Sequence, residues 1–197
     1  MAHLAGTEAL GITIDRALCL DLDHHTPNTL SPLISALKGL GLAPYWGPGT
    51  TRGSRVWLFL KGGDAEAYAK TLAKLAQALG FAPCEPYPNG GKPIILPFFG
   101  VASKVQKGRP LYGPDGKPVH YQDFSPIRAK EEELQAVSKA VGLFLTAMQR
   151  RPQSRHDTAM AFLNIAARMG VAEKLAVLMG TEAFFEAWGL DDGARTL

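Results

Sequence analysis

The alternation of strand-like and helix-like segments in the first half of the chain most constrains its fold. RVWLFL, at 55–60, is a β-branched and aromatic run typical of a buried strand. Residues 11–23 read as one or two further strands, with a break near Asp15–Arg16. Apolar residues recur at helical spacing over 31–41, which opens with Ser-Pro, and over 64–80, which opens with a capping aspartate and closes with glycine. This order predicts strands and helices in one body.

Turn signals continue this pattern to about residue 124. The segment PCEPYPNGGKPIILPFFG, at 83–100, holds two short strand candidates around an Asn-Gly-Gly turn. GPDG, at 113–116, is a tight turn that predicts the tip of a hairpin. We therefore expect an α+β domain over residues 1–124.

A helical pattern replaces the mixed one in the remainder of the chain. It opens at Ser125–Pro126, continues with apolar residues on one side, and stops at Pro152. Residues 154–188 read as two or three shorter helices, divided by glycines. The sequence thus predicts a helical C-terminal region over 125–197.

Composition narrows the class of protein without identifying it. The 197 residues are enough for one domain, or one domain with a small appendage. With 46% hydrophobic and 20% charged residues the composition is that of a globular protein. No apolar run approaches the roughly 20 residues of a membrane span, so no membrane partner is expected. The N-terminus does not read as a secretory signal, and two distant cysteines, Cys19 and Cys84, favour a cytoplasmic location. A net charge of +3 permits nucleic-acid binding without indicating it.

The stretch CLDLDHH, at 19–25, carries the first chemical signal. Asp21 and Asp23 alternate with leucines, so in a strand both carboxylates would share one face, roughly 7 Å apart. Like charges so placed repel each other unless something positive lies between them. The pair is either a strand end that begins a turn or a ligand pair for Mg²⁺ or Mn²⁺. A zinc site at His24 and His25 is not expected, because the sequence has no second cluster at ligand spacing.

Two later segments could complete such a site. Glu85 is the candidate third carboxylate, although a solvated glutamate at a strand edge is the alternative, since prolines flank it. The loop GTTRGSR, at 49–55, could cradle a phosphate with backbone N–H groups and two guanidinium groups. It is not a P-loop, because it lacks the lysine motif and leads into a strand.

Taken in order, these motifs resemble those of the archaeo-eukaryotic primase superfamily, in the primase-polymerase branch of plasmids, phages, conflict systems and CRISPR loci. LDLDHH resembles the first motif, hhhDhD, and RGSRVWLFL the second, G-x-H-V-W-h-F. CEPYPNGGKPIILPFFG resembles the third, E-h-[FY]-P followed by G-x-x-h-x-LP-h-x-G. The segment at 3–12 is similar to what precedes the first motif, so the resemblance covers about residues 3–124.

The resemblance implies an RRM-like catalytic core with a small second α/β unit and a helical C-terminal addition. It implies a DNA primase and DNA polymerase that transfers nucleotides by a two-metal mechanism, with Mg²⁺ or Mn²⁺ held by Asp21, Asp23 and Glu85. Its partners would be a single-stranded DNA template and nucleoside triphosphates, with a helicase or another replication module as a further possibility. The segment 154–170 is similar to a helical segment that follows such domains in primase-helicase proteins.

The resemblance also implies a set of nucleotide-binding residues. These are Arg52, Ser54, Arg55 and Lys92. Arg55 stands where the family has a histidine; an arginine grips phosphate with a permanent charge but does not exchange a proton at neutral pH. Some relatives carry the third acid one position earlier, where this chain has a cysteine, and the role is therefore assigned to Glu85.

Three other interpretations fit the same residues. The chain could be a degenerate primase-fold domain that binds nucleic acid or nucleotides without catalysis, an interpretation that Arg55 favours. It could be a metal-dependent nuclease of a mobile element, which also needs grouped carboxylates. The simplest alternative is an α+β interaction domain whose acids lie near one another by chance.

Overall fold

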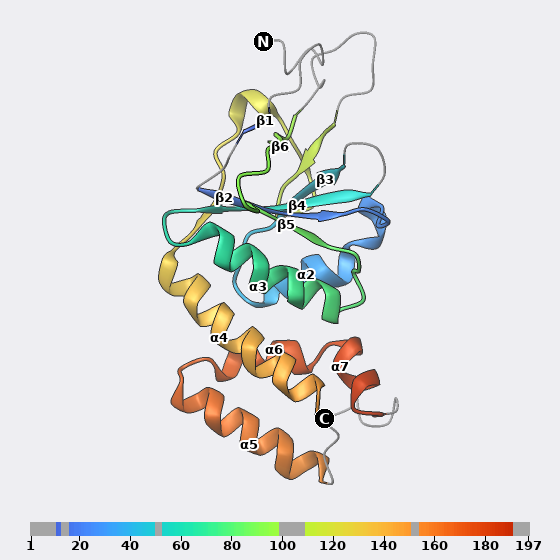
Figure 1. Ribbon diagram of the computed structural model, residues 1–197, viewed down its shortest axis with the longest axis vertical. Helices are drawn as coiled ribbons and strands as arrows, with labels where there is room; N and C mark the ends of the chain where they lie inside the picture. The colour runs from blue at the N-terminus through green and yellow to red at the C-terminus, as the bar shows by residue number, and fades with distance from the viewer. Residues whose placement is uncertain (1–10, 13–15, 50–52, 99–108, 151–153, 191–197) are drawn as a thin grey trace.

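The centre of the structure, a computed structural model that describes residues 11–12, 16–49, 53–98, 109–150 and 154–190, is a seven-stranded and mainly antiparallel sheet (Figure 1). Its path is β5-β2-β4-β3-β7-β8, and β9 joins the end of β4 in parallel. A separate two-stranded ribbon pairs β1 with β6. The strands are β1 (Gly11–Ile12), β2 (Ala17–Leu22), β3 (Tyr45–Pro48), β4 (Ser54–Leu60), β5 (Glu85–Tyr87), β6 (Ile94–Ile95), β7 (Leu111–Tyr112), β8 (Pro118–Val119) and β9 (Arg128–Ala129).

Helices cover one face of the sheet and continue below it as a helical group (Figure 1). α2 and α3 lie directly under the sheet, and α4 leads from beside α3 to α5, α6 and α7. The helices are α2 (Ser31–Gly39), α3 (Ala65–Ala78), α4 (Glu131–Met148), α5 (Arg155–Arg168), α6 (Ala172–Met179) and α7 (Glu182–Ala187), with short 3₁₀ turns η1 (Pro27–Thr29) and η2 (Tyr121–Asp123). The structure confirms the predicted α+β class.

The central part of the chain has the element order β2-α2-β3-β4-α3-β5 and the strand order β5-β2-β4-β3. This is a split β-α-β arrangement, in which the first and third strands of the unit lie at the centre of the sheet. The central strands are β2 and β4, so the aspartate and arginine motifs lie in the middle of the sheet and not at its edge.

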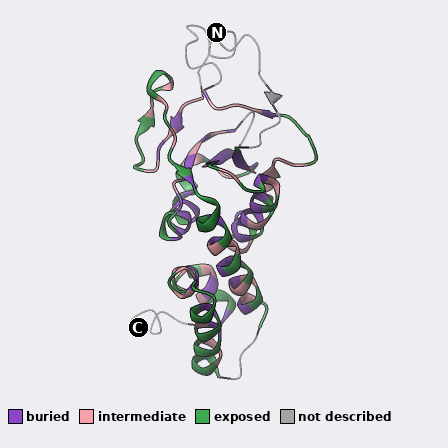
Figure 2. Ribbon diagram, turned by 90° about the vertical axis from the view of Figure 1, so that its left-hand side faces the viewer, coloured by how far each residue is buried: buried purple, intermediate pink, exposed green. Residues whose placement is uncertain are grey.

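Side-chain alternation along β2 and β4 separates two cores. The leucines at 18, 20 and 22 and the even-numbered residues of β4 face α2 and α3 and are almost completely buried. Ala17, Cys19 and Trp57 face the other way, into a smaller core with Tyr45 and Leu111. Figure 2 shows the buried residues on the sheet and on the helix sides that face it. Each core forms because neighbours in a strand point to opposite faces.

Local signals explain why α3 begins and ends where the sequence predicts. The Asp64 carboxylate accepts a hydrogen bond from the Ala67 N–H at 3.0 Å and so caps the first turn. Tyr68, Leu72 and Leu75 form the buried stripe. Gly80 has φ +89°, a left-handed conformation that stops the helix at little cost for glycine. The prediction for this helix is confirmed.

The helical C-terminal region shares its core with the sheet domain. Buried residues of α2, α3, α4, α5, α6 and α7 form one continuous hydrophobic cluster. Trp188, next to α7, donates its indole N–H to the Ala147 carbonyl of α4 at 2.9 Å. The predicted short helices within 154–188 are confirmed as α5, α6 and α7.

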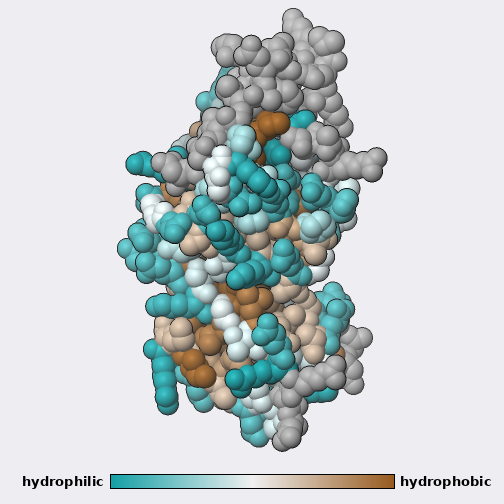
Figure 3. All heavy atoms as spheres, viewed as in Figure 1, coloured by the Kyte–Doolittle hydropathy of each residue, from teal (hydrophilic) through white to brown (hydrophobic). Residues whose placement is uncertain are grey.

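Some hydrophobic side chains of this region stay exposed. They include Met160 and Ile165 on α5 and Met169 at its end. In the view of Figure 3, hydrophilic side chains cover much of the described surface and the larger hydrophobic patches lie over the helical half. Within the described residues, no helix combines the length and the apolar character that crossing a membrane requires.

The start of the long helix was predicted wrongly. α4 begins at Glu131, whereas the sequence predicts a start at Ser125–Pro126. The helix starts later because the residues before it, including β9, are extended. β9 pairs with the end of β4, and the Ile127 N–H donates to the Tyr45 hydroxyl at 2.9 Å. The helix then starts where the Glu133 carboxylate accepts the Lys130 N–H at 2.8 Å.

Two turn predictions have different outcomes. GPDG at 113–116 does connect an antiparallel pair, β7 and β8. The strands on either side of the Asn-Gly-Gly turn exist, but they do not pair with each other: β5 pairs with β2, and β6 pairs with β1. The Lys92 N–H donates to the Asn89 carbonyl at 3.0 Å, and this turn directs the chain away from β5.

Candidate functional site

Three neighbouring strands bring Asp21, Arg55 and Glu85 together. β2 lies between β4 and β5, and Asp21 stands opposite Arg55 on one side and opposite Glu85 on the other. Directly opposed residues share a face of the sheet. All three side chains therefore lie on the face away from α2 and α3, at the end where β2 finishes.

Asp21 and Arg55 form a nearly buried ion pair. Arg55 donates from Nε at 3.1 Å and from Nη2 at 2.9 Å, both to Asp21 Oδ2. Its Nη1 donates to the Ile95 carbonyl at 3.1 Å. The Arg55 and Asp21 side chains are only 10% and 14% exposed. The positive charge that Asp21 requires is thus supplied by the protein itself, through charge-assisted hydrogen bonds.

Glu85 has a different and more exposed partner. Lys92 Nζ donates to Glu85 Oε1 at 2.8 Å, with side chains 62% and 39% exposed. Tyr87 donates its hydroxyl at 3.1 Å, and Asn89 its amide at 3.4 Å. The hydrogen bond from Lys92 lowers the pKa of Glu85 most, against a smaller opposing effect of burial. Burial, and then the bond to Glu85, raise the pKa of Tyr87 to about 12. Glu85 is therefore ionised at neutral pH and Tyr87 keeps its proton.

Asp23 lies one residue beyond the strand and does not share its pleat. β2 ends at Leu22, and the next residues form a turn in which the His25 N–H donates to the Leu22 carbonyl at 3.3 Å. Asp23 is exposed there. The prediction that the strand extends through Asp23 is wrong by one residue, because the chain turns at this point.

The backbone before β4 touches this turn. Gly53 has φ +87°, and a Cβ placed on it would come within 2.2 Å of the Leu22 carbonyl oxygen and 2.8 Å of the Asp23 Cα. Only a residue without a side chain fits there. Gly53 therefore packs directly against the backbone of the turn that holds Asp23.

The other predicted nucleotide-binding residues are placed differently. Ser54 is completely buried on the helix-covered face, opposite to Arg55, and its Oγ has no hydrogen-bond partner among the described residues. Lys92 lies beside Glu85, on the exposed side of the site. Arg52 lies outside the described residues. The structure thus groups Asp21, Arg55, Glu85 and Lys92, and it separates Ser54 from them.

A second arginine near Arg55 has no sequence signal that would have identified it. Arg109 and Arg55 line the same small hollow, together with Gly47, Trp57, Ile95 and Pro97. The hollow has about 10 Å³ of open space, about enough for one water molecule. Burial and then the charge of Arg55 lower the pKa of Arg109. Arg109 follows the third motif at a distance, and only the fold brings it to Arg55.

The predicted metal ligands are carboxylates, the donor type that a hard cation prefers. In the structure, however, cationic side chains already pair with two of them. Asp21 and Glu85 are cross-strand neighbours and Asp23 is two residues after Asp21, so the three carboxylates come from neighbouring parts of the backbone. Two of them hold cationic side chains instead, Arg55 and Lys92. Within the described ranges, no group of three or more His, Cys, Asp and Glu side chains is already positioned for a metal ion. The metal site stays a prediction, and it requires Arg55 to release Asp21.

The histidines after the aspartates differ in environment. His24 is exposed, whereas the His25 ring packs against Phe81 with 5.0 Å between ring centroids. His25 Nε2 is buried and has no hydrogen-bond partner in the described part of the chain. The His25 ring therefore packs the turn that follows β2 against Phe81.

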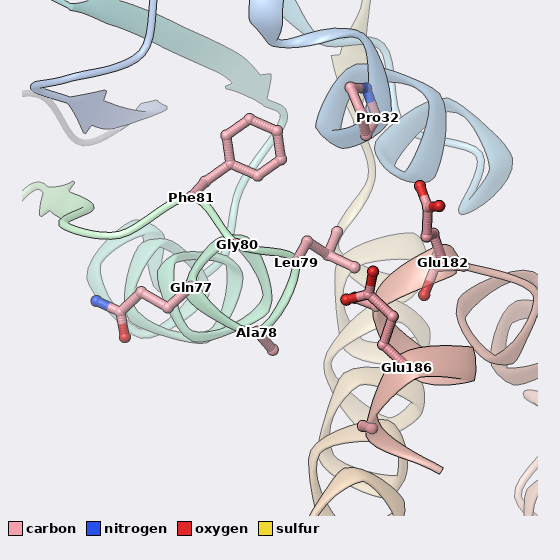
Figure 4. Close-up of a pocket in the computed structure, with 11 residues that line it drawn as sticks. Pro32, Gln77, Ala78, Leu79, Gly80, Phe81, Glu182 and Glu186 are labelled. Atoms are coloured by element: carbon pink, nitrogen blue, oxygen red, sulfur yellow. The ribbon is translucent and has the colours of Figure 1, made fainter. Parts of the chain in front are cut away.

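A more open cleft of about 660 Å³ lies elsewhere, between the end of α3 and α7. Figure 4 shows Glu182 and Glu186 projecting from α7 toward this space, with Leu79 and Pro32 on the opposite side. None of the metal-binding or nucleotide-binding residues predicted from the sequence lines this cleft. The cleft is therefore separate from the sheet face that carries Asp21, Arg55 and Glu85.

Comparison of the sequence with models of known protein families found none that matches, and comparison with curated proteins found no match either. The interpretation of the site therefore depends on its motifs and geometry.

Proposed function

We propose that this chain is a template-dependent nucleotidyltransferase, a DNA primase and polymerase with the RRM-like catalytic core of the archaeo-eukaryotic primase superfamily. One observation carries the proposal: the register of β2 with β4 and β5 brings Asp21, Arg55 and Glu85, one residue from each motif, to the same end of one sheet face. The β-α-β-β-α-β order of the sheet domain supports it as well.

In this proposal Asp21, Asp23 and Glu85 hold Mg²⁺ or Mn²⁺, which when bound would neutralise charge on the triphosphate and activate the attacking hydroxyl. Arg55 contributes a planar pair of N–H donors for phosphate oxygens. Lys92 contributes a mobile point charge, since its side chain is exposed at 62%. Because Glu85 is kept ionised by its neighbours, it needs no proton release before it binds a cation.

The test is incorporation of labelled nucleotides on single-stranded DNA with Mn²⁺ or Mg²⁺, with and without a primer. We expect product from the wild type and none from the Asp21→Ala/Asp23→Ala variant. Asp115→Ala is the matched control, because it removes an exposed carboxylate from the β7–β8 turn and should keep activity. Product without a primer would identify a primase. Equal product from the double variant and the wild type would refute the proposal.

A second function is favoured by the Asp21–Arg55 pair. If Arg55 held Asp21 permanently, the domain would bind nucleic acid or nucleotides without catalysis. In that case no variant and no condition would give product, while single-stranded DNA would still bind. The two functions therefore differ in whether Arg55 leaves Asp21.

A further inference from the structure

We propose that Arg55 is a gate that couples the two ligands of the site: it withholds Asp21 from a divalent cation until the triphosphate group of a nucleotide takes over its guanidinium group. This inference rests on the proposed function and adds a regulation to it. Arg55 suits this role because its guanidinium group stays charged at neutral pH.

The first argument is that Arg55 occupies the ligand itself. Two of its nitrogens converge on Oδ2 of Asp21, at 2.9 and 3.1 Å, and a third holds the Ile95 carbonyl. A cation that approaches Asp21 meets a fixed positive charge within hydrogen-bonding distance of the same carboxylate. At the 10% and 14% exposure of these side chains, solvent screens that repulsion poorly. In the observed state, Asp21 is therefore a weak metal ligand.

The second argument is that the surroundings of Arg55 favour the binding of an added anion. Its guanidinium shares a hollow with Arg109, and there the charge of Arg55 adds to burial in lowering the pKa of Arg109. A neighbouring positive charge favours an added anion at Arg55, and phosphate offers the Arg55 guanidinium a pair of oxygen acceptors. The hollow has room for about one water molecule. A phosphate group therefore enters only if Arg55 moves.

The third argument is the contrast with Glu85. Its cation, Lys92, is 62% exposed, so a metal ion displaces it at little cost. Arg55 is nearly buried and held by three hydrogen bonds, so its release needs a replacement partner. Of the two cations paired with the predicted metal ligands, Arg55 is therefore the one that can make metal binding depend on a nucleotide.

The experiment measures Mn²⁺ binding by calorimetry on the full chain without nucleotide. Arg55→Gln removes the charge that holds Asp21, and we expect it to bind Mn²⁺ about tenfold more tightly than the wild type. Arg109→Gln is the matched control, since it removes a neighbouring positive charge and leaves the Asp21–Arg55 pair in place. A charge that acts only through space should change the Mn²⁺ affinity by less than about threefold.

A reciprocal measurement covers the case in which Arg55→Gln does not fold. In EDTA, a fluorescent deoxynucleoside triphosphate is titrated into wild type, Asp21→Asn and Asp23→Asn. Coupling acts equally in both directions, so freeing Arg55 in Asp21→Asn should tighten metal-free binding by about tenfold. Asp23→Asn makes the same change of charge at a residue that does not hold Arg55, and it should have a smaller effect.

Three results are distinguishable. Tighter Mn²⁺ binding in Arg55→Gln but not Arg109→Gln, or tighter nucleotide binding in Asp21→Asn but not Asp23→Asn, supports the gate. Equal affinities in all variants overturn the gate, while Mn²⁺-dependent nucleotide incorporation by the wild type leaves the proposed function intact. Absence of Mn²⁺ binding in every variant, with or without nucleotide, overturns both.

Discussion

Replacing each of the two cations at the site tests whether the Asp21–Arg55 pair is as buried and as strong as its geometry indicates. The variants are Arg55→Met and Lys92→Met, which remove the positive charge and keep an unbranched apolar side chain. Each leaves one carboxylate without its cation: Asp21 at 14% exposure, and Glu85 at 39%.

The expected costs differ because of this exposure. Arg55→Met removes two hydrogen bonds to Asp21 and one to the Ile95 carbonyl, and it leaves an uncompensated charge beside Glu85. Breaking such a pair from one side costs about 3–5 kcal/mol of unfolding free energy. Lys92→Met breaks an exposed pair, for which about 0–1 kcal/mol is expected.

Urea unfolding followed by circular dichroism measures both costs. A domain whose stability lies above the lower end of the usual range of about 5–15 kcal/mol keeps a positive free energy of unfolding after a loss of about 3–5 kcal/mol. The double variant Asp21→Asn/Arg55→Met should recover part of the loss, since it removes the unpaired carboxylate. If Arg55→Met costs no more than Lys92→Met, the ion pair is not the buried anchor described here, and the reasoning about the gate loses its physical basis.

Two further predictions concern Gly53 and Glu85. Gly53→Ala should lower stability by about 1–3 kcal/mol through backbone strain alone, and more through its clash with the Leu22 carbonyl; Gly62→Ala, which meets no atom within 4 Å, is the control, and equal melting temperatures would contradict the close approach. The lowered pKa of Glu85 stabilises the fold above the unfolded-state value of about 4.3, and this contribution disappears as the pH falls through the lower folded-state pKa. Lys92→Met should raise the pKa of Glu85 and reduce that loss on acidification, which carbon NMR titration of the carboxyl group measures; an unchanged titration would show that Lys92 does not hold Glu85 in solution.

The parts of the fold that the sequence predicts are those governed by local physics. The RVWLFL run forms β4 because its side chains suit a strand buried on both faces. Asp64 caps α3, and Gly80 ends it, for reasons that lie within a few residues of each position. The predicted helices at 31–41 and 64–80 agree with α2 and α3 to within a few residues.

The parts that it misses depend on contacts between distant segments. A Ser-Pro pair at 125 looks like a helix start, but the end of β4 offers hydrogen bonds that keep the chain extended through β9. Arg109 carries no motif, and it becomes visible only when the fold places it beside Arg55. Ser54 fits a phosphate loop by sequence, yet strand alternation turns it to the covered face. Local patterns do not contain these pairings.

The DxD motif shows the same limit in the site itself. The sequence predicts Asp21 and Asp23 on one strand, where they would require a positive charge nearby, and it indicates a metal ion as the source. In the fold, an arginine 34 positions along the chain supplies that charge for Asp21. The two solutions compete for the same carboxylate, so the pair is compatible both with a metal site that opens when a nucleotide binds and with a site that never opens. The two sites differ in the free energy needed to move Arg55 away from Asp21. For that reason the Mn²⁺ affinity of Arg55→Gln, compared with that of the wild type, tests the function more directly than the presence of the motif does.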